Sequence, residues 1–332
     1  MASVLAAVAF ATVCQEGGGV NIVFMGSPQF AVPCLDVLVD AGHTVSLVIS
    51  QPDRPAGRGR KLAPTAVKAA ALERDLPVMT QDSGRAERER VTALVQDLNP
   101  DAVVVTAFGH ILREPLLSLP RLGCINVHFS LLPRWRGVSP VQHAILHGDA
   151  WTGVTVMQMD AGVDTGPILA VGPTPVDGRE TGGELFDRLG LLGADLLLQT
   201  LQDLEAGRVT PTPQSDLGAV YAPKLSKSLS PIRWDREAVT VHNQVRALDP
   251  FPGTTSYLGD KLLKIGKAEP AGLNDSGAAP GTVLDVSDQG VLVACGEGVV
   301  RLLQMQAPGR RMLPVADFLR GFPVQPGAVF TS

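Results

Sequence analysis

The sequence contains few cysteines and few aromatic residues. Its four cysteines, at positions 14, 34, 124 and 295, are scattered and form no C-x-x-C pair. We therefore expect neither a zinc site nor a disulfide framework, and a reducing cytoplasm is the setting that this pattern favours. Aromatic residues make up 5% of the chain, whereas 35 glycines and 26 prolines predict many loops.

The sequence also lacks nucleotide-binding and membrane signals. Neither G-x-G-x-x-G nor G-x-x-x-x-G-K-[ST] follows the first expected strand, so no dinucleotide or nucleoside triphosphate is implied. Residues 1–19 are apolar but too short for a membrane span. An export signal requires a Lys or Arg before its apolar run, and none precedes the apolar run here. We interpret residues 1–19 as a disordered extension and expect a cytoplasmic protein without membrane contact.

Charge is unevenly distributed along the 332 residues. The net charge is −5, which gives the whole chain no general attraction to nucleic acid. Residues 1–223 carry 16 basic and 23 acidic side chains, whereas residues 224–332 carry 12 and 10. Any contact with RNA must therefore use local basic patches.

Strand-like and helix-like segments alternate through the first half of the chain. The expected strands are 20–25, 44–50, 102–108, 124–128 and 152–159, and the expected helices are 29–41, 64–74, 86–98 and 139–150. Such alternation predicts an α/β fold with a Rossmann-like, mostly parallel sheet and helices on both faces. Ligands of these sheets bind beyond the carboxyl ends of the strands.

The second half of the chain shows a different pattern of expected helices and strands. Residues 178–206 predict one or two helices, because Thr181 and Glu184 have the spacing of a capping box before an apolar stripe. Residues 207–228 are rich in Pro, Ser, Thr and Gln and read as a linker. After one expected helix at 232–248, five short alternating runs predict a small antiparallel barrel. The predicted domains are thus 20–206 and 229–332.

The segment 123–169 contains the candidate catalytic residues. Asn126 and His128 are two positions apart on an expected strand, so their side chains share one face. Together they can supply hydrogen-bond donors to an oxyanion. Asp164, in a glycine-flanked loop, can orient His128 and raise its basicity. Taken singly, these residues are more often a turn former, a satisfied histidine and a turn aspartate.

The block that continues with Ser130-Leu-Leu-Pro133 and Arg134-Trp-Arg-Gly137 resembles the signature of the folate-dependent formyltransferases. The resemblance extends from about residue 20 to the C-terminus. It implies an OB-like second domain and transfer of a formyl group from 10-formyltetrahydrofolate to an amine, with Asn126, His128 and Asp164 as the catalytic residues. It also implies that no metal and no covalent enzyme intermediate are needed. The chain departs from the usual pattern at Phe129, where Gly is commoner.

The resemblance further assigns residues to the folate. The stretch 130–133 matches the folate-binding segment of the family, and residues 108–112 are expected to form a wall for the pterin. The residues assigned in this way are Phe108, Gly109, Ile111, Leu112, Ser130, Leu131, Leu132 and Pro133.

A basic, glycine-spaced loop at residues 51–62 is the strongest indication of the acceptor. Short charged loops are usually just solvated, but arginines on a mobile backbone suit a phosphodiester chain. Family members that formylate initiator methionyl-tRNA have a closely similar loop, which enters the acceptor arm. The predicted tRNA contacts are Arg54, Arg58, Arg60, Lys61, Arg134, Arg136, Lys264, Arg310 and Arg311.

Three other functions stay open at this point. A sugar-nucleotide formyltransferase and a formyl-folate hydrolase fit the catalytic residues, but fit the arginine loop less well. An RNA- or folate-binding protein without catalysis would not need Asn126, His128 and Asp164 together. We expect a monomer that requires no protein partner.

Overall fold

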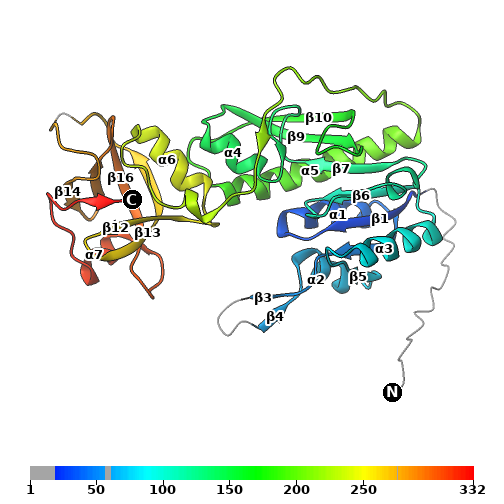
Figure 1. The fold of residues 1–332 in the computed structure, drawn as a ribbon, viewed down its shortest axis with the longest axis horizontal. Coiled ribbons are helices and arrows are strands. Elements are labelled where there is room, and N and C mark those ends of the chain that lie inside the picture. The colour runs from blue at the N-terminus through cyan, green and yellow to red at the C-terminus, as the bar shows by residue number, and fades with distance from the viewer. Residues whose placement is uncertain (1–18, 57–60, 275) are drawn as a thin grey trace.

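Two sheets, each with its own hydrophobic core, organise the chain (Figure 1). The computed structural model describes residues 19–56, 61–274 and 276–332. The first sheet and its helices form the blue-to-green part of the molecule, and the second sheet forms the yellow-to-red part beside it. Within these described ranges, no helix is long and apolar enough to cross a membrane.

The first sheet has seven strands, of which five are parallel. They are β1 (Asn21–Gly26), β2 (Thr44–Ser50), β5 (Val78–Thr80), β6 (Ala102–Thr106), β7 (Cys124–His128), β9 (Trp151–Gln158) and β10 (Ile168–Pro175). Their order is β10-β9-β7-β6-β1-β2-β5. Strand β9 runs antiparallel to β7, and β10 runs antiparallel to β9. The prediction of a Rossmann-like, mostly parallel sheet is confirmed.

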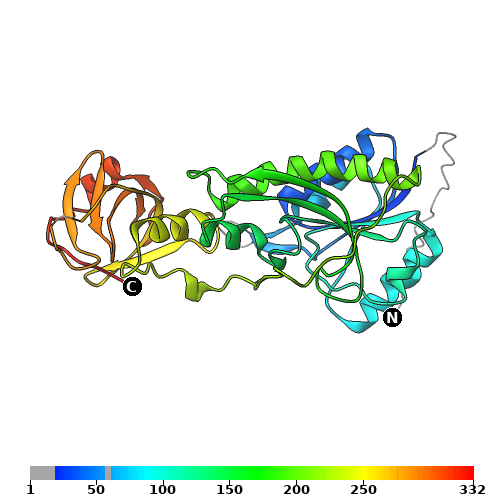
Figure 2. The same cartoon turned by 90° about the horizontal axis from the view of Figure 1, so that it is seen from above.

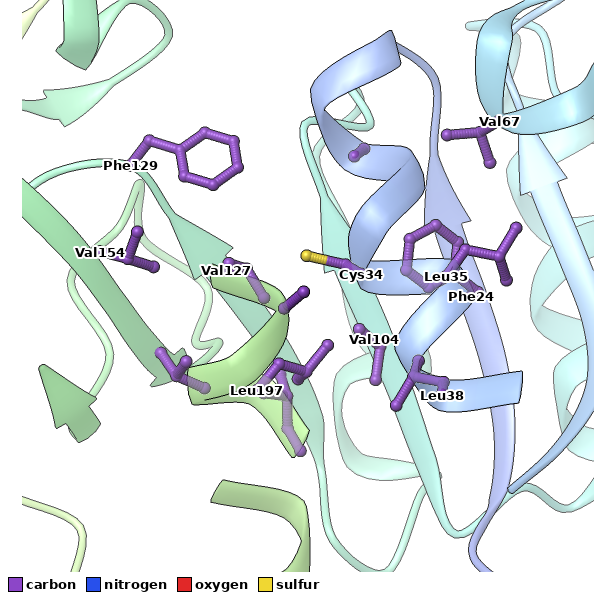
Figure 3. Packing of buried hydrophobic residues seen from close by; sticks show 14 of the residues in the cluster. Phe24, Cys34, Leu35, Leu38, Val67, Val104, Val127, Phe129, Val154 and Leu197 are labelled. Carbon is purple, nitrogen blue, oxygen red and sulfur yellow. The ribbon is translucent and has the colours of Figure 1, made fainter. Parts of the chain in front are cut away.

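Helices cover both faces of this sheet (Figure 2). They are α1 (Val32–Asp40), α2 (Ala66–Glu73), α3 (Arg85–Leu98), α4 (Pro140–Leu146) and α5 (Gly182–Glu205), with short 3-10 turns η1 (Gln29–Ala31) and η2 (Leu116–Ser118). Alternation along β6 sends Val104 to the core under α1 and α5, and Val103 to the core under α3. Figure 3 shows Cys34 and Leu38 of α1 beside Val104.

Helix α5 illustrates how local sequence sets this packing. Thr181 Oγ1 accepts the Glu184 N–H (3.2 Å), and Glu184 Oε2 accepts the Thr181 N–H (2.8 Å), which forms the predicted capping box. Leu185, Leu189 and Leu197 are fully buried against the sheet. Each contributes about 1.5–3 kcal/mol by leaving water.

The second sheet is antiparallel and curled, consistent with the predicted OB-like domain. Its strands are β12 (Thr254–Leu258), β13 (Lys261–Pro270), β14 (Val283–Ser287), β15 (Gly290–Ala294), β16 (Val299–Gln306), β17 (Leu313–Pro314) and β18 (Phe330–Thr331). Helices α6 (Ala238–Ala247) and α7 (Val315–Gly321) pack against them. The buried indole of Trp234 donates from Nε1 to Ser256 Oγ (2.9 Å), which satisfies its polar atom within the core.

Some segments differ from the predictions. The helix expected over 232–248 begins only at Ala238, because the Ile232 N–H bonds to Thr255 O (2.9 Å) and the preceding chain lies along β12. The helix expected over 139–150 is limited to α4. The arginine loop contains a hairpin of β3 (Arg54–Ala56) and β4 (Lys61–Ala63).

The predicted linker also contains regular structure. Strand β11 (Tyr221–Ala222) pairs with β8 (Arg136–Gly137), and a 3-10 turn, η3 (Lys227–Leu229), follows. The linker therefore returns to the catalytic segment before it enters the second sheet. The boundaries at residues 206 and 228 stay predictions, and the predicted extension lies outside the described residues except for Gly19.

Candidate active site

The three predicted catalytic side chains meet at the carboxyl end of β7. Asn126 Nδ2 donates to Asp164 Oδ1 (3.2 Å), and His128 Nδ1 lies 3.6 Å from Asp164 Oδ2. Asn126 is 9% exposed and His128 is 6% exposed. The structure thus brings together residues that are 38 positions apart in the sequence.

Asp164 is held in an unusual backbone conformation. Its φ angle is 53°, in the left-handed region, which costs an L-residue about 1–2 kcal/mol, although Asp tolerates it better than most. The Gly137 N–H donates to Asp164 Oδ2 (2.8 Å), and Gln214 Nε2 donates to the carbonyls of Asp164 (2.9 Å) and Gly166 (2.7 Å). These bonds fix the carboxylate in front of His128.

The contacts of His128 define which ring nitrogen carries the hydrogen in the neutral form. Nε2 lies 2.9 Å from the carbonyl oxygen of Trp135. A carbonyl can only accept, so Nε2 carries the hydrogen, and in the neutral ring Nδ1 holds the lone pair. This lone pair faces the Asp164 carboxylate. Nδ1 is therefore arranged to take up a proton, which makes His128 and Asp164 an ion pair, and the neutral ring has no N–H left for an oxyanion.

A cavity of about 280 Å³ opens beside these three residues. Four of the residues predicted to bind folate line it, namely Phe108, Gly109, Ile111 and Leu112. Gln51 Nε2 donates to Phe108 O (2.8 Å), which ties this wall to the end of β2. The lining is mostly apolar with the polar trio at one side, as is typical of a small-molecule site.

The other predicted folate segment, residues 130–133, does not belong to the described lining of this cavity. Ser130 Oγ donates to Arg134 O (2.7 Å), and Thr155 Oγ1 donates to Ser130 O (2.7 Å). The Leu132 N–H in turn donates to Thr155 Oγ1 (3.1 Å). This segment is a hydrogen-bonded turn between His128 and Trp135. It supports the Trp135 carbonyl, which accepts from His128 Nε2.

Three phenylalanines form an aromatic wall of the cavity. Phe30 and Phe186 stack with 4.2 Å between ring centroids, and Phe129 meets Phe30 edge-on at 5.3 Å. Phe129 is 4% exposed, so this larger side chain is accommodated where the family more often has Gly. Sequence reasoning missed Phe30 and Phe186; the position of Phe30 just after β1, where ligands bind, was the available signal.

A second cavity, of about 550 Å³, lies on the other side of residues 110–112. Helix α3 lines it with Arg85 and Arg88, and the loop after His110 contributes Arg113. Burial is the main cause that lowers the pKa of His110, so its ring is neutral at pH 7. Glu89, which pairs with Arg85 (2.7 Å), and Glu114 also line this cavity. The cavity is therefore charged, in contrast to the mostly apolar cavity at the catalytic residues.

Most of the predicted tRNA contacts are either exposed or outside the described residues. Arg54 and Lys61 on the hairpin, and Lys264, Arg310 and Arg311 on the second sheet and its loops, are exposed to solvent. Arg58 and Arg60 lie outside the described residues. All of these contacts stay predictions.

Arg134 and Arg136 are instead used internally. Arg134 is paired with Asp149 (2.6 Å). Arg136 is 2% exposed and paired with Asp216 (3.0 Å), and its Nε donates to Gln214 Oε1 (3.1 Å). The burial of Arg136 argues against the predicted phosphate contact. Its guanidinium instead bonds to Gln214, which holds the Asp164 loop.

Comparison with known proteins agrees with the fold. Residues 20–201 match the model of the formyl transferase family, and residues 224–323 match the model of the formyl transferase C-terminal domain. The chain therefore belongs to the formyl transferase family.

The curated relatives of the chain have a more specific name than the family. The chain is 46% identical over 310 residues to "Methionyl-tRNA formyltransferase" of Aromatoleum aromaticum, covering 93% of this chain and 96% of that protein. It is 47% identical over 299 residues to the protein of the same name from Stutzerimonas stutzeri, covering 90% and 93%.

Solved structures share the fold at lower identity. HypX from Aquifex aeolicus in complex with tetrahydrofolic acid matches with a TM-score of 0.64 at 19% identity, covering 95% of this chain and 51% of that one. An N-formyltransferase from Helicobacter canadensis, in complex with folinic acid and dTDP-3-aminofucose, matches with a TM-score of 0.62 at 18% identity, covering 85% and 99%.

Proposed function

We propose that this protein transfers the formyl group of 10-formyltetrahydrofolate to the α-amine of initiator methionyl-tRNA, giving N-formylmethionyl-tRNA for translation initiation. The observation that carries this proposal is the convergence of Asn126, His128 and Asp164 at one mostly apolar cavity. The relatives named methionyl-tRNA formyltransferase, which match over at least nine-tenths of this chain, support this acceptor.

The chemistry follows from the contacts of the three residues. The acceptor amine, with an ordinary pKa of about 7.7, is substantially neutral near pH 7 and attacks the formyl carbon directly. One N–H of the Asn126 amide bonds to Asp164, which leaves the second to stabilise the oxyanion of the tetrahedral intermediate.

The proton then follows a defined route. His128 Nδ1 takes it from the attacking nitrogen, and Asp164 stabilises the imidazolium from 3.6 Å. As the carbon–N10 bond breaks, the proton passes to N10 of the folate, so the new amide and tetrahydrofolate both leave with balanced charge.

The two cavities suit the two ends of the formyl donor. The apolar wall at residues 108–112 fits a flat pterin next to the catalytic residues. The adjoining cavity, with Arg88 and Arg113 in its lining, fits the carboxylates of the glutamate tail.

A direct assay tests the activity. The protein is incubated with 10-formyltetrahydrofolate labelled in the formyl group and with either methionyl-tRNA or a sugar-nucleotide amine. We expect the label to appear on methionyl-tRNA. Label on the sugar amine alone, or release of free formate without either acceptor, would replace the proposal by one of the rival functions.

The arginine loop gives a second test of the acceptor. Arg58→Ala should raise the KM for methionyl-tRNA and reduce the slope of log affinity against log salt by about 0.9, the value for one phosphate contact. The KM for the folate should not change. The matched control is Arg208→Ala, which removes an exposed arginine that is paired with Asp203. Equal salt slopes for Arg58→Ala and the control would contradict a phosphate contact by Arg58.

A further inference from the structure

Asp149 connects two residues of the segment that follows His128. Its Oδ2 accepts the indole N–H of Trp135 (2.7 Å) and the Nε–H of Arg134 (2.8 Å), and its Oδ1 accepts from the other side of the same guanidinium (2.6 Å). The guanidinium carbon of Arg134 also lies 4.3 Å from the centroid of the Trp135 ring. Asp149, Arg134 and Trp135 thus form one hydrogen-bonded unit, which we call the Asp149 clamp.

The Asp149 clamp is itself rigidly placed. The Asp149 N–H bonds to Ala144 O (3.0 Å) at the end of α4, and its side chain is 13% exposed. Burial alone would raise the pKa of this carboxyl, but hydrogen bonds from Arg134 and Trp135 outweigh it and hold the pKa below its usual range. Asp149 is therefore a carboxylate at neutral pH.

Trp135 needs such an anchor because of its backbone. Its φ angle is 65°, a left-handed conformation that side chains with a Cβ rarely adopt. The ring is 3% exposed, and His147 packs on it with 4.7 Å between centroids. The orientation of the ring and that of the carbonyl are coupled through this one residue, and the carbonyl is the group that accepts from His128 Nε2.

We propose that Asp149 is a positioning residue for formyl transfer, because it fixes the Trp135 carbonyl that keeps the hydrogen of His128 on Nε2 and the lone pair on Nδ1. The inference rests on the proposed role of His128. Asp149 is not part of the described lining of either cavity, so it acts through Trp135 and not on the substrates.

Asp149→Asn is the main test, since it preserves size but removes the charge and one acceptor. The single-turnover rate of formylation should fall about 10- to 100-fold, the usual cost of a small displacement of a catalytic group. The KM values for methionyl-tRNA and for the folate should stay within about twofold, because no substrate contact is lost. Asp149→Glu, which restores the carboxylate, should recover part of the rate.

A tautomer measurement separates positioning from simple destabilisation. In protein labelled with ¹⁵N-histidine, the signals of His128 are those absent from the spectrum of His128→Gln. The parent should show the Nε2–H tautomer, whereas Asp149→Asn should show a mixture of the two tautomers. The control is Asp203→Asn, which breaks a similar pair with Arg208 in the turn after α5 and should alter neither rate nor tautomer.

The outcomes are distinct. A parental rate, or a reduced rate with an unchanged His128 tautomer, would overturn the positioning role. If Asp149→Asn does not fold, Trp135→Phe decides the question, because it removes the indole N–H that bonds to Asp149 and keeps an aromatic ring at this position. Absence of formyl transfer to methionyl-tRNA by the parent would refute the proposed function itself, whereas an inactive His128→Ala beside a fully active Asp149→Asn would refute only this inference.

Discussion

Replacing Asp164 by Asn isolates the charge at the centre of the candidate site. Each carboxylate oxygen accepts one N–H in the structure: Oδ1 from Asn126 and Oδ2 from Gly137. An asparagine has only one acceptor oxygen, so in either orientation its NH₂ group must face one of these donors. The variant therefore loses the negative charge beside His128 and also one hydrogen bond.

The size of the effect follows from the 3.6 Å separation of His128 Nδ1 and Asp164 Oδ2. With an effective dielectric constant of about 20, Coulomb's law gives about 4–5 kcal/mol between a protonated ring and the carboxylate, as an upper bound. Part of this stabilisation survives through solvent and the remaining dipoles. We therefore expect a loss of about 3–4 kcal/mol in the transition state, or a 10²- to 10³-fold lower rate.

The pH profile tests the same contact. Because His128 loses its charged partner, the pH dependence of the rate should change in Asp164→Asn. Single-turnover formylation, followed between about pH 5.5 and 8.5, measures both the rate and its pH dependence. A rate within about threefold of the parent together with an unchanged pH profile would refute the reasoning and leave Asp164 as a turn residue.

Two further predictions concern stability. Leu197→Ala, at a fully buried position between α5 and the sheet, should lower the free energy of unfolding by about 3–4 kcal/mol in urea titrations, because it leaves a cavity; a loss below about 1 kcal/mol would mean that the core collapses around the site. Mild acid should also destabilise the protein through His43. Burial lowers the pKa of His43, so the unfolded chain binds a proton near pH 6.5 that the folded chain excludes, and stability falls as pH drops below about 6.5. His43 Nδ1 accepts the Val20 N–H (3.1 Å), and His43→Gln should weaken this pH dependence in urea titrations at two pH values; an identical pH dependence would contradict the assignment.

Much of the fold could be predicted because its signals are local. Strand β7 is short, apolar and fully buried, and the capping box of α5 lies within four residues. Strand β10 was missed because Gly172, Pro173 and Pro175 argue against a strand. The structure places it at the edge of the sheet, where residues without a free N–H are tolerated.

The trio at the site could be predicted, but its supports could not. Gln214 reaches the Asp164 loop from 50 residues away, and Arg136 pairs with Asp216 across 80 residues. The tautomer of His128 depends on the backbone angle of Trp135. None of these contacts leaves a periodic pattern in the sequence, and the contacts of Gln214 and Asp216 depend on how the linker returns to the catalytic segment.

The arginines show most clearly what residue type alone cannot decide. Arg134 and Arg136 each face a carboxylate that a phosphate would have to displace, whereas Arg54 on the hairpin bonds only to the neutral amide of Gln51 among the described residues (2.7 Å). Counterion release rewards arginines that are free to meet a phosphate, and internal ion pairs offer little of this gain. In a chain of net charge −5, the salt dependence of tRNA binding should therefore arise at the hairpin and the second sheet. It follows that Arg134→Ala should lower the rate of transfer with little change in the salt slope, and a reduced slope in that variant would return Arg134 to the RNA interface.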